Sequence, residues 1–191
     1  MYLKEGLNED DVLILTKPIG TGTLFAADMR RKAKGRWVSD AIQVMLHSNQ
    51  QAAECLQKYE ATSCTDVTGF GLLGHLVEMT RASQVDAEIY IEQLPLLDGA
   101  RDTVAAGILS SLQPQNIRLR RAIQNIDQAS THQDYPLLFD PQTAGGLLAG
   151  IPEKNAHACL NELRQLGYGN ACIIGKVHAQ SDHSSPIKVT I

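Results

Sequence analysis

Three stretches of this sequence combine glycine and threonine with a lysine or a carboxylate, as loops that bind phosphate groups do. They are residues 16–22 (TKPIGTG), 64–71 (CTDVTGFG) and 140–146 (DPQTAGG). Glycine lets a backbone approach a ligand closely and leaves its amide proton free. Amides at the start of a helix direct positive partial charge outward, which suits a phosphate. The three stretches therefore predict anion-binding loops.

The second stretch also carries a carboxylate that is suited to a metal. Asp66 would offer a hard oxygen to Mg²⁺, which takes one or two carboxylates together with phosphate oxygens. The alternative for Asp66 is a cap of the following turn. Lys17 either binds phosphate or is simply exposed. The complete set of candidate nucleotide ligands is Lys17, Gly20, Thr21, Gly22, Thr65, Thr68, Gly69, Thr143, Gly145 and Gly146.

Established nucleotide motifs are absent from the sequence. It contains no GxxxxGK[ST] loop and no GxGxxG fingerprint, so each stretch alone is weak evidence for a ligand site. The chain has 191 residues and a net charge of −4, which suits one domain and argues against a broad nucleic-acid surface. Its four cysteines form no CxxC pair, which predicts reduced thiols, no structural zinc and a cytoplasmic location. No apolar run reaches the ~20 residues of a membrane span.

Alternating apolar runs and amphipathic stretches predict the elements that hold these loops. Strands are expected at residues 12–16, 64–68, 87–91, 147–151, 171–177 and 187–191. Helices are expected at about 21–34, 39–58, after Gly71 and from Pro152 to Gly167, with a broken helical region at 94–135. The order of elements predicts an α/β (α+β) fold in which helices pack on a mixed β-sheet.

The amino-acid sequences of the three stretches resemble those of the C-terminal domain of selenide, water dikinases, also called selenophosphate synthetases. Residues 15–22, 64–76 and 140–147 occur in that family's order, and the resemblance extends from about residue 6 to residue 177. The wider superfamily includes aminoimidazole ribonucleotide synthetase, the hydrogenase-maturation dehydratase and thiamine monophosphate kinase, whose second stretch is shorter. The fold implied is the C-terminal-domain fold of aminoimidazole ribonucleotide synthetase. Residues 29–48 and 107–112 look most like versions fused behind an NADH-dehydrogenase-like flavoprotein.

The resemblance implies a two-domain enzyme that makes selenophosphate, AMP and phosphate from ATP, selenide and water. It implies that the N-terminal domain supplies the reactive cysteine or selenocysteine, a lysine and most of the Mg²⁺-binding aspartates. No catalytic residue is therefore expected in this chain, and the chain alone is expected to be inactive. Residues 1–10 are interpreted as a linker remnant and residues 11–191 as a single C-terminal domain.

The expected role of this domain is to close over Mg²⁺ and ATP held by the N-terminal domain, with Asp66 as a further Mg²⁺ ligand. The expected partners are ATP, selenide, the N-terminal domain and, in a homodimer, a second copy of the chain. Two other functions stay open: a non-catalytic interaction or scaffold domain in a fusion protein, and a superfamily relative that acts on another phosphorylated substrate.

Several residues near the stretches have simpler interpretations. Cys64 is interpreted as a small buried residue at a strand end rather than a nucleophile. His75 is interpreted as a helix-surface or core-edge histidine, and Asp140 as a turn or helix-cap residue. The sequence also departs from the family at two places. Ala144 replaces a serine of the third stretch, and only Asn116 remains of an Arg-Asn pair, which puts a ligand role of that loop in doubt.

Overall fold

Short apolar runs form the strands of the central sheet, and their side chains point alternately to its two faces. In the computed structural model, which describes residues 4–191, β1 (Asp11–Leu15) is buried along its whole length. Leu13 and Leu15 face one hydrophobic cluster, whereas Val12 and Ile14 face the other. Successive side chains of a strand point to opposite faces, so this one strand contributes to the cores on both sides of the sheet.

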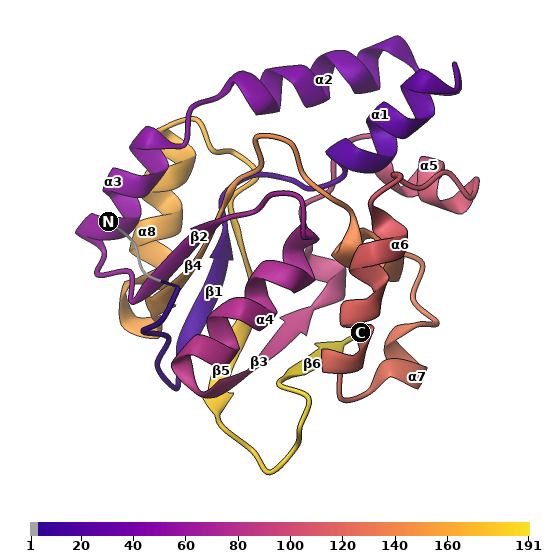
Figure 1. Ribbon diagram of the computed structural model, residues 1–191. Coiled ribbons are helices and arrows are strands. Elements are labelled where there is room, and N and C mark those ends of the chain that lie inside the picture. The colour runs from indigo at the N-terminus through magenta and orange to yellow at the C-terminus, as the bar shows by residue number, and fades with distance from the viewer. Residues whose placement is uncertain (1–3) are drawn as a thin grey trace.

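Six strands form one sheet in the order β2-β4-β1-β5-β3-β6 (Figure 1). All neighbouring pairs are antiparallel except β3 and β6, which are parallel. The expected mixed sheet with packed helices is confirmed. Besides β1, the strands are β2 (Ser63–Asp66), β3 (Val85–Tyr90), β4 (Leu147–Pro152), β5 (Cys172–Ala179) and β6 (Ile187–Thr190).

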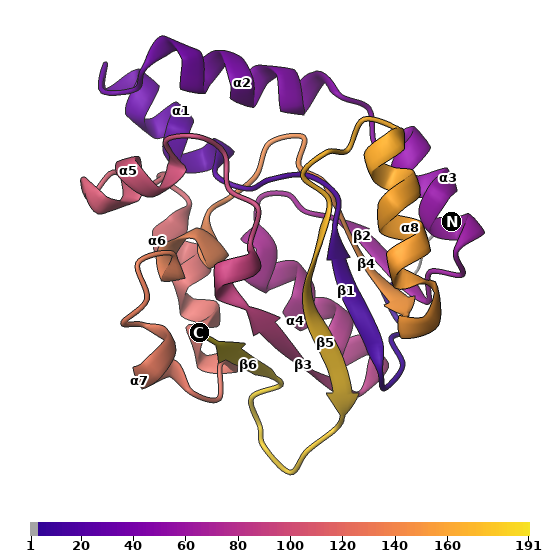
Figure 2. The ribbon, with the colours of Figure 1, turned by 180° about the vertical axis from the view of Figure 1, so that it is seen from behind.

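Helices cover both faces of the sheet. On one face, α3 (Gln50–Lys58) and α8 (Glu153–Gln165) lie side by side (Figure 2). On the other face, α4 (Gly71–Ser83) packs with the short helix η3 (Tyr135–Phe139). The remaining helices are α1 (Thr21–Met29), α2 (Gly35–Leu46), η1 (Ile91–Gln93), α5 (Ala100–Ala105), α6 (Gln113–Asn116), η2 (Ile117–Ala122) and α7 (Ile126–Ala129). No helix in the described part of the chain is long and apolar enough to cross a membrane.

The helix expected at residues 39–58 is two helices, and the single-helix prediction is wrong. The chain is extended at His47, between α2 and α3, and the carbonyl of His47 accepts a 2.5 Å hydrogen bond from Lys17 Nζ. Asn49 Nδ2 donates to the carbonyl of Gly145 over 2.9 Å. The segment between α2 and α3 is thus hydrogen-bonded to the first and third glycine-rich loops. These tertiary contacts override the helical periodicity of residues 39–58.

Three- and four-residue spacing over residues 38–56 predicts an apolar face that includes Val38, Ile42 and Met45, and the structure departs from this face within α2. Trp37 and Ala41 are the buried residues of α2, and half-buried Val44 packs beside them. Ile42, which belongs to the predicted face, is 40% exposed. The sequence of α2 offers apolar residues on more than one side, and the position of Gly99 beneath the Trp37 ring selects the side that packs.

Residues 4–10, which were expected to belong to a linker remnant, lie against the domain in the described structure. Leu7 is 3% exposed and joins the core cluster. The amides of Gly6 and Leu7 both donate to Ser83 Oγ at the end of α4, each over 3.0 Å. These contacts tie the first described residues to the α4 side of the sheet.

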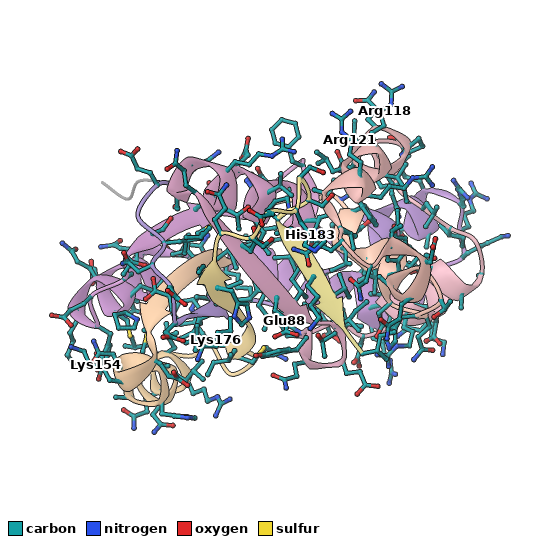
Figure 3. All side chains as sticks on the ribbon, turned by 90° about the horizontal axis from the view of Figure 1, so that it is seen from below. Glu88, Arg118, Arg121, Lys154, Lys176 and His183 are labelled. Atoms are coloured by element: carbon teal, nitrogen blue, oxygen red, sulfur yellow. The ribbon has the colours of Figure 1, made fainter. Side chains whose placement is uncertain are left out.

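Charged side chains of β5, β3 and β6 lie next to one another on one face of the sheet, where Glu88 pairs in register with Lys176 and Lys188. Figure 3 views the molecule from below, where Glu88, Lys176 and His183 lie. Glu88 is paired there, with Lys188 Nζ at 3.3 Å and His178 Nε2 at 3.4 Å. Lys176 Nζ lies 3.1 Å from Glu153 Oε2. Charges of opposite sign therefore neutralise one another on this face.

Substitution of Gly99 is expected to loosen the contact between α2 and α5. Gly99 has φ +84°, and a Cβ there would lie 2.2 Å from the Trp37 ring. Gly99→Ala should therefore lower the free energy of unfolding by about 3 kcal/mol, because overpacking adds to left-handed strain. Urea unfolding monitored by Trp37 fluorescence measures this loss.

Gly107→Ala is the matched control. Gly107 has a similar φ of +70°, but a Cβ there would meet nothing within 4 Å. Its substitution should cost only the backbone strain, about 1 kcal/mol. Equal losses of unfolding free energy for the two variants would contradict the packing of the Trp37 ring against Gly99.

Candidate functional site

The three glycine-rich stretches meet at one end of the sheet because β4 lies between β1 and β2 and runs antiparallel to both. The first two stretches follow the ends of β1 and β2, and the third precedes the start of β4. Leu15 pairs with Leu148, and Asp66 pairs with Leu147. Segments that are distant in sequence, such as Gly22 and Asp140 at a separation of 118 residues, therefore become adjacent.

Two glycines of the third loop are required by this packing. A Cβ on Gly145 would lie 2.2 Å from the carbonyl oxygen of Val67, and a Cβ on Gly146 would lie 2.5 Å from the amide nitrogen of Lys17. The amide of Val67 donates to the carbonyl of Gly146 over 2.9 Å. Both glycines are buried. Their missing side chains allow backbone to pack on backbone, and a ligand is not needed to explain them.

The amides at the start of α1 are bonded within the protein. Gly20 and Thr21 donate to Gln142 Oε1 over 3.0 and 3.2 Å, and Gly22 donates to Asp140 Oδ2 over 3.0 Å. The expectation that glycine leaves these amides free does not hold in this structure. Sequence reasoning missed Gln142. The available signal was a glutamine, with both donor and acceptor atoms, in the middle of the third stretch.

Asp140 is a helix cap that reaches α1 from a distant part of the chain. Its side chain is fully buried, Oδ2 accepts from Gly22 and from Gln142 Nε2, and Oδ1 has no hydrogen-bond partner in the described residues. The interpretation as a cap residue is confirmed. Burial raises the pKa of this carboxyl to about 7, although the hydrogen bonds from Gln142 and Gly22 favour the charged form.

Lys17 is buried, so the interpretation as an exposed lysine is wrong. It is 3% exposed, and its ammonium donates to the backbone carbonyls of His47 and Ala144 over 2.5 and 3.4 Å. Burial lowers the pKa of this side chain. Ala144 has a left-handed φ of +47°, as the third loop turns toward β4. Lys17 therefore joins the first loop to the third loop and to the break between α2 and α3.

His75 and Asn116 hold the second loop. His75 is 3% exposed, and its Nε2 accepts a 3.0 Å hydrogen bond from the amide of Thr68. Burial lowers the pKa of His75, which agrees with a neutral ring that accepts this bond. Asn116 Nδ2 donates to the carbonyls of Gly69 and Phe139 over 2.8 and 3.0 Å. The core-edge interpretation of His75 is confirmed, and both side chains position backbone.

The candidate ligand residues divide by exposure. Asp66, Gly69 and Thr143 are exposed, and Gly22 and Thr68 are half-buried. The others are buried: Lys17, Gly20, Thr21, Thr65, Gly145 and Gly146. In this conformation the first five are the most accessible to a ligand, and most of the buried six bond or pack within the loops.

A groove lies beside three of these five residues, Gly22, Gly69 and Thr143. It has a volume of about 350 Å³, and α1 forms one wall with Phe25 and Met29. The opposite side is formed by Leu112 and by parts of the second and third loops, including Gly69 and Thr143. A Cβ on Gly69 would meet nothing within 4 Å. Unlike Gly145 and Gly146, Gly69 leaves open space in front of its backbone.

Asp66 offers an exposed carboxylate beside the second loop. Its side chain is exposed at the end of β2, and no residue of the described chain engages its carboxylate in a hydrogen bond or an ion pair. It lines an open cavity of about 340 Å³ together with Thr65 and Lys4. Within residues 4–191 no group of three or more His, Cys, Asp or Glu side chains is placed to hold a metal ion. A Mg²⁺ ion here would need most of its ligands from phosphate, water or another polypeptide.

Cys64 precedes this site but points into the core. The thiol belongs to the hydrophobic cluster that α3 and α8 build, and burial raises its pKa to about 12. A thiol with so high a pKa is a poor nucleophile at neutral pH. The interpretation of Cys64 as a buried structural residue is confirmed.

Replacement of Asp140 is expected to change the pH dependence of stability. The folded protein keeps a proton on Asp140 up to about pH 7, whereas an unfolded aspartate loses it near pH 4. Stability from this group is therefore present at acid pH and is lost as the pH rises, by about 3 kcal/mol at most between pH 5 and 8. Asp140→Asn removes this titration. Urea unfolding at pH 5 and pH 8 should show a smaller loss of unfolding free energy for the variant than for the unchanged protein. Identical losses would contradict a raised pKa of the buried Asp140 carboxyl.

Comparison with known proteins assigns the chain to a family. Residues 8–188 match the family described as AIR synthase related protein, C-terminal domain. The chain is 34% identical to selenide, water dikinase 2 of Peptoclostridium acidaminophilum, over 94% of this chain and 51% of that protein. It is 37% identical to the selenide, water dikinase of Clostridioides difficile strain 630, over 87% of this chain and 48% of that protein. The chain thus spans about half the length of these curated relatives.

Solved structures agree on the fold. The hydrogenase maturation protein HypE of E. coli superposes with a TM-score of 0.71 at 17% identity, over 98% of this chain and 48% of that chain. Thiamine monophosphate kinase from Aquifex aeolicus superposes with a TM-score of 0.59 at 17% identity, over 98% of this chain and 52% of that chain. The fold and the resemblance inferred from the three stretches are both confirmed. This chain belongs to the AIR synthase related protein, C-terminal domain family, in which it is similar to selenide, water dikinases.

Proposed function

We propose that this chain is the C-terminal domain of a selenide, water dikinase and closes over Mg²⁺-ATP held by an N-terminal half. The observation that carries the proposal is identity of 34 and 37% to two enzymes of that name, over 94 and 87% of the chain. In such an enzyme the products would be selenophosphate, AMP and phosphate from ATP, selenide and water. The N-terminal half would supply the catalytic residues, and this chain would supply none.

The arrangement of the loops supports a nucleotide at this end of the sheet. Asp66, Gly69 and Thr143 present a carboxylate, an open backbone and a hydroxyl from two adjacent loops. A HypE structure with a TM-score of 0.66 and 18% identity to this chain was solved in complex with ATP. That likeness extends over 92% of this chain. We infer that the exposed residues contact the phosphates and that the buried candidates act through the loops that they hold.

Asp66 is the proposed Mg²⁺ ligand of this chain. Its exposed carboxylate has no competing partner in the described structure, and hard oxygen donors are what Mg²⁺ prefers. When bound, the ion would neutralise charge on the phosphates. A single carboxylate from this half would favour closure of the two halves around the nucleotide, because the remaining ligands would come from phosphate and the other half.

Apolar side chains beside the loops give the N-terminal half a surface to contact. Met29, Phe70 and Leu112 are 84, 58 and 46% exposed. Met29 and Leu112 line the groove, and Phe70 follows Gly69 in the second loop. Exposed apolar patches typically mark interaction surfaces. We propose that this rim packs on the N-terminal half and that the same rim would mediate any homodimer of the chain alone.

Replacement of Asp66 is expected to reduce activity far more than stability. In an enzyme that contains both halves, Asp66→Asn should lower AMP formation from ATP and selenide at least ~10²-fold, since loss of a transition-state contact costs about 3 kcal/mol. Thermal melting should change little, because an exposed carboxylate contributes little core packing. AMP production and melting temperature are measured on the same protein.

Asp127→Asn is the matched control for Asp66→Asn. Asp127 is exposed on α7, away from the three loops (Figure 1). Its substitution removes the same charge and should leave both activity and melting temperature close to those of the unchanged enzyme. If Asp66→Asn were destabilised by about 1 kcal/mol but fully active, Asp66 would be a turn cap rather than a metal ligand.

The chain alone is expected to form no AMP from ATP and selenide, because the proposed catalytic residues lie in the other half. The same assay on the protein that joins this chain to an N-terminal half should detect AMP, phosphate and selenophosphate in equal amounts. Turnover by the chain alone at the rate of the joined protein would contradict the proposal that the catalytic residues lie in the N-terminal half. A joined protein that binds ATP but makes no AMP would favour a non-catalytic domain.

A further inference from the structure

One buried residue, Gln142, contacts all three glycine-rich loops, the first and third through its side chain and the second through its backbone amide. Gln142 is 4% exposed, and its Oε1 accepts from the amides of Gly20 and Thr21 and from the Thr21 hydroxyl at 3.0–3.2 Å. Its Nε2 donates to the carbonyl and to Oδ2 of Asp140 over 2.8 and 3.0 Å. Its own amide donates to the carbonyl of Thr68 over 3.0 Å. The first, second and third loops are thus linked at a single residue.

These contacts require both chemical ends of a glutamine amide. The oxygen faces only donors, at the start of α1, and the nitrogen faces only acceptors, on Asp140. A carboxylate would keep the first set and lose the second, and asparagine is one methylene shorter. All the polar groups involved are buried, so an unmatched end would leave buried groups without partners.

The network ends at residues that are exposed to the groove. Thr21 Oγ1 accepts a 3.0 Å hydrogen bond from the amide of Thr143. The carbonyl of Thr68, which Gln142 bonds, lies next to Gly69 and two residues after Asp66. Gln142 itself is buried and has no free donor with which to hold a ligand. Its influence on a ligand must pass through the loops.

We propose that Gln142 is a positioning residue that fixes the three loops in the arrangement that binds nucleotide and supports turnover. The proposal rests on the proposed function for its catalytic part, whereas the positioning itself is a property of this chain. It also assigns the amides of Gly20, Thr21 and Gly22 to the internal network rather than to phosphate.

Gln142→Glu tests the network by replacing a single non-hydrogen atom, the amide nitrogen, with oxygen. Its carboxylate keeps the acceptor for Gly20 and Thr21 but places a second carboxyl about 3 Å from that of Asp140, as the Nε2 to Oδ2 distance shows. At acid pH the two carboxyls share a proton, which replaces the lost hydrogen bond. At alkaline pH both ionise and repel each other.

Amide hydrogen exchange of the chain measures how Gln142→Glu changes the hydrogen bonding of the loop amides. We expect the protection factors of Gly20 and Thr21 in Gln142→Glu to be within about threefold of the unchanged chain at pH 6. At pH 9 they should be lower by about tenfold or more, the effect of 1.4 kcal/mol. Protection of Leu13 and Ile14 in β1 should persist. If the β1 amides lose protection equally, or if Gly20 and Thr21 keep theirs at pH 9, the positioning role is refuted.

Two controls separate the pair interaction from the added charge. The exchanged pair Asp140→Asn with Gln142→Glu restores one carboxyl and one amide, so protection at pH 9 should return to within about threefold of the unchanged chain. Gln115→Glu adds the same charge at an exposed position and should leave Gly20 and Thr21 protected. Failure of the exchanged pair to restore protection would overturn the proposed contact.

Turnover of the protein that contains both halves tests the catalytic part. The kcat of Gln142→Glu relative to the unchanged enzyme should fall about tenfold between pH 6 and pH 9, and the exchanged pair should remove this pH dependence. A flat kcat ratio despite lost protection would refute the catalytic part of the proposal. If the unchanged enzyme makes no AMP, the proposed function fails, and the exchange experiment still decides whether Gln142 positions the loops.

Discussion

The pairing of β4 with both β1 and β2 is the constraint on which the rest of the structure depends. Antiparallel pairing on both sides places the end of β1, the end of β2 and the start of β4 at the same edge of the sheet. The hydroxyl of Thr16 accepts from the amide of Leu147, and the amide of Thr16 donates to the carbonyl of Leu147, so the junction is bonded in both directions. Any change in this register would separate the loops.

Close approach of backbones then turns three loops into one unit. The glycines at positions 145 and 146 allow contacts that no side chain would permit, and Lys17 and Asp140 are buried beside them. Burial of these two ionisable groups opposes their charged forms, lowering the pKa of Lys17 and raising that of Asp140. Hydrogen bonds to backbone offset part of that cost and orient the loops. The polar interior at this edge is therefore a support for backbone geometry.

This organisation separates the residues that face solvent from those that hold them. Gly69 and Thr143 are exposed at a groove and Asp66 at a separate open cavity, whereas His75, Asn116 and Gln142 are buried and bond to the loop backbones. Such a division suits a domain that meets a nucleotide bound to another half of the protein. The exposed groups can contact phosphate after closure, and the buried groups keep them in place before it.

The sequence by itself determined the strands, the loops and the family. Short apolar runs with flanking glycine or proline are local signals, and the wording of the three stretches needs no structure to be recognised. The sequence also placed Cys64 and His75 correctly, because strand ends and apolar helix faces favour burial. Tertiary structure alone decided that residues 39–58 form two helices, since His47 and Asn49 bond to loops that are distant in sequence. It also decided that the amides of Gly20 to Gly22 are occupied and that Gln142 joins the loops. Hydrogen-bond partners that are 30 to 122 residues apart leave no periodic pattern in a sequence, so only the folded chain reveals them.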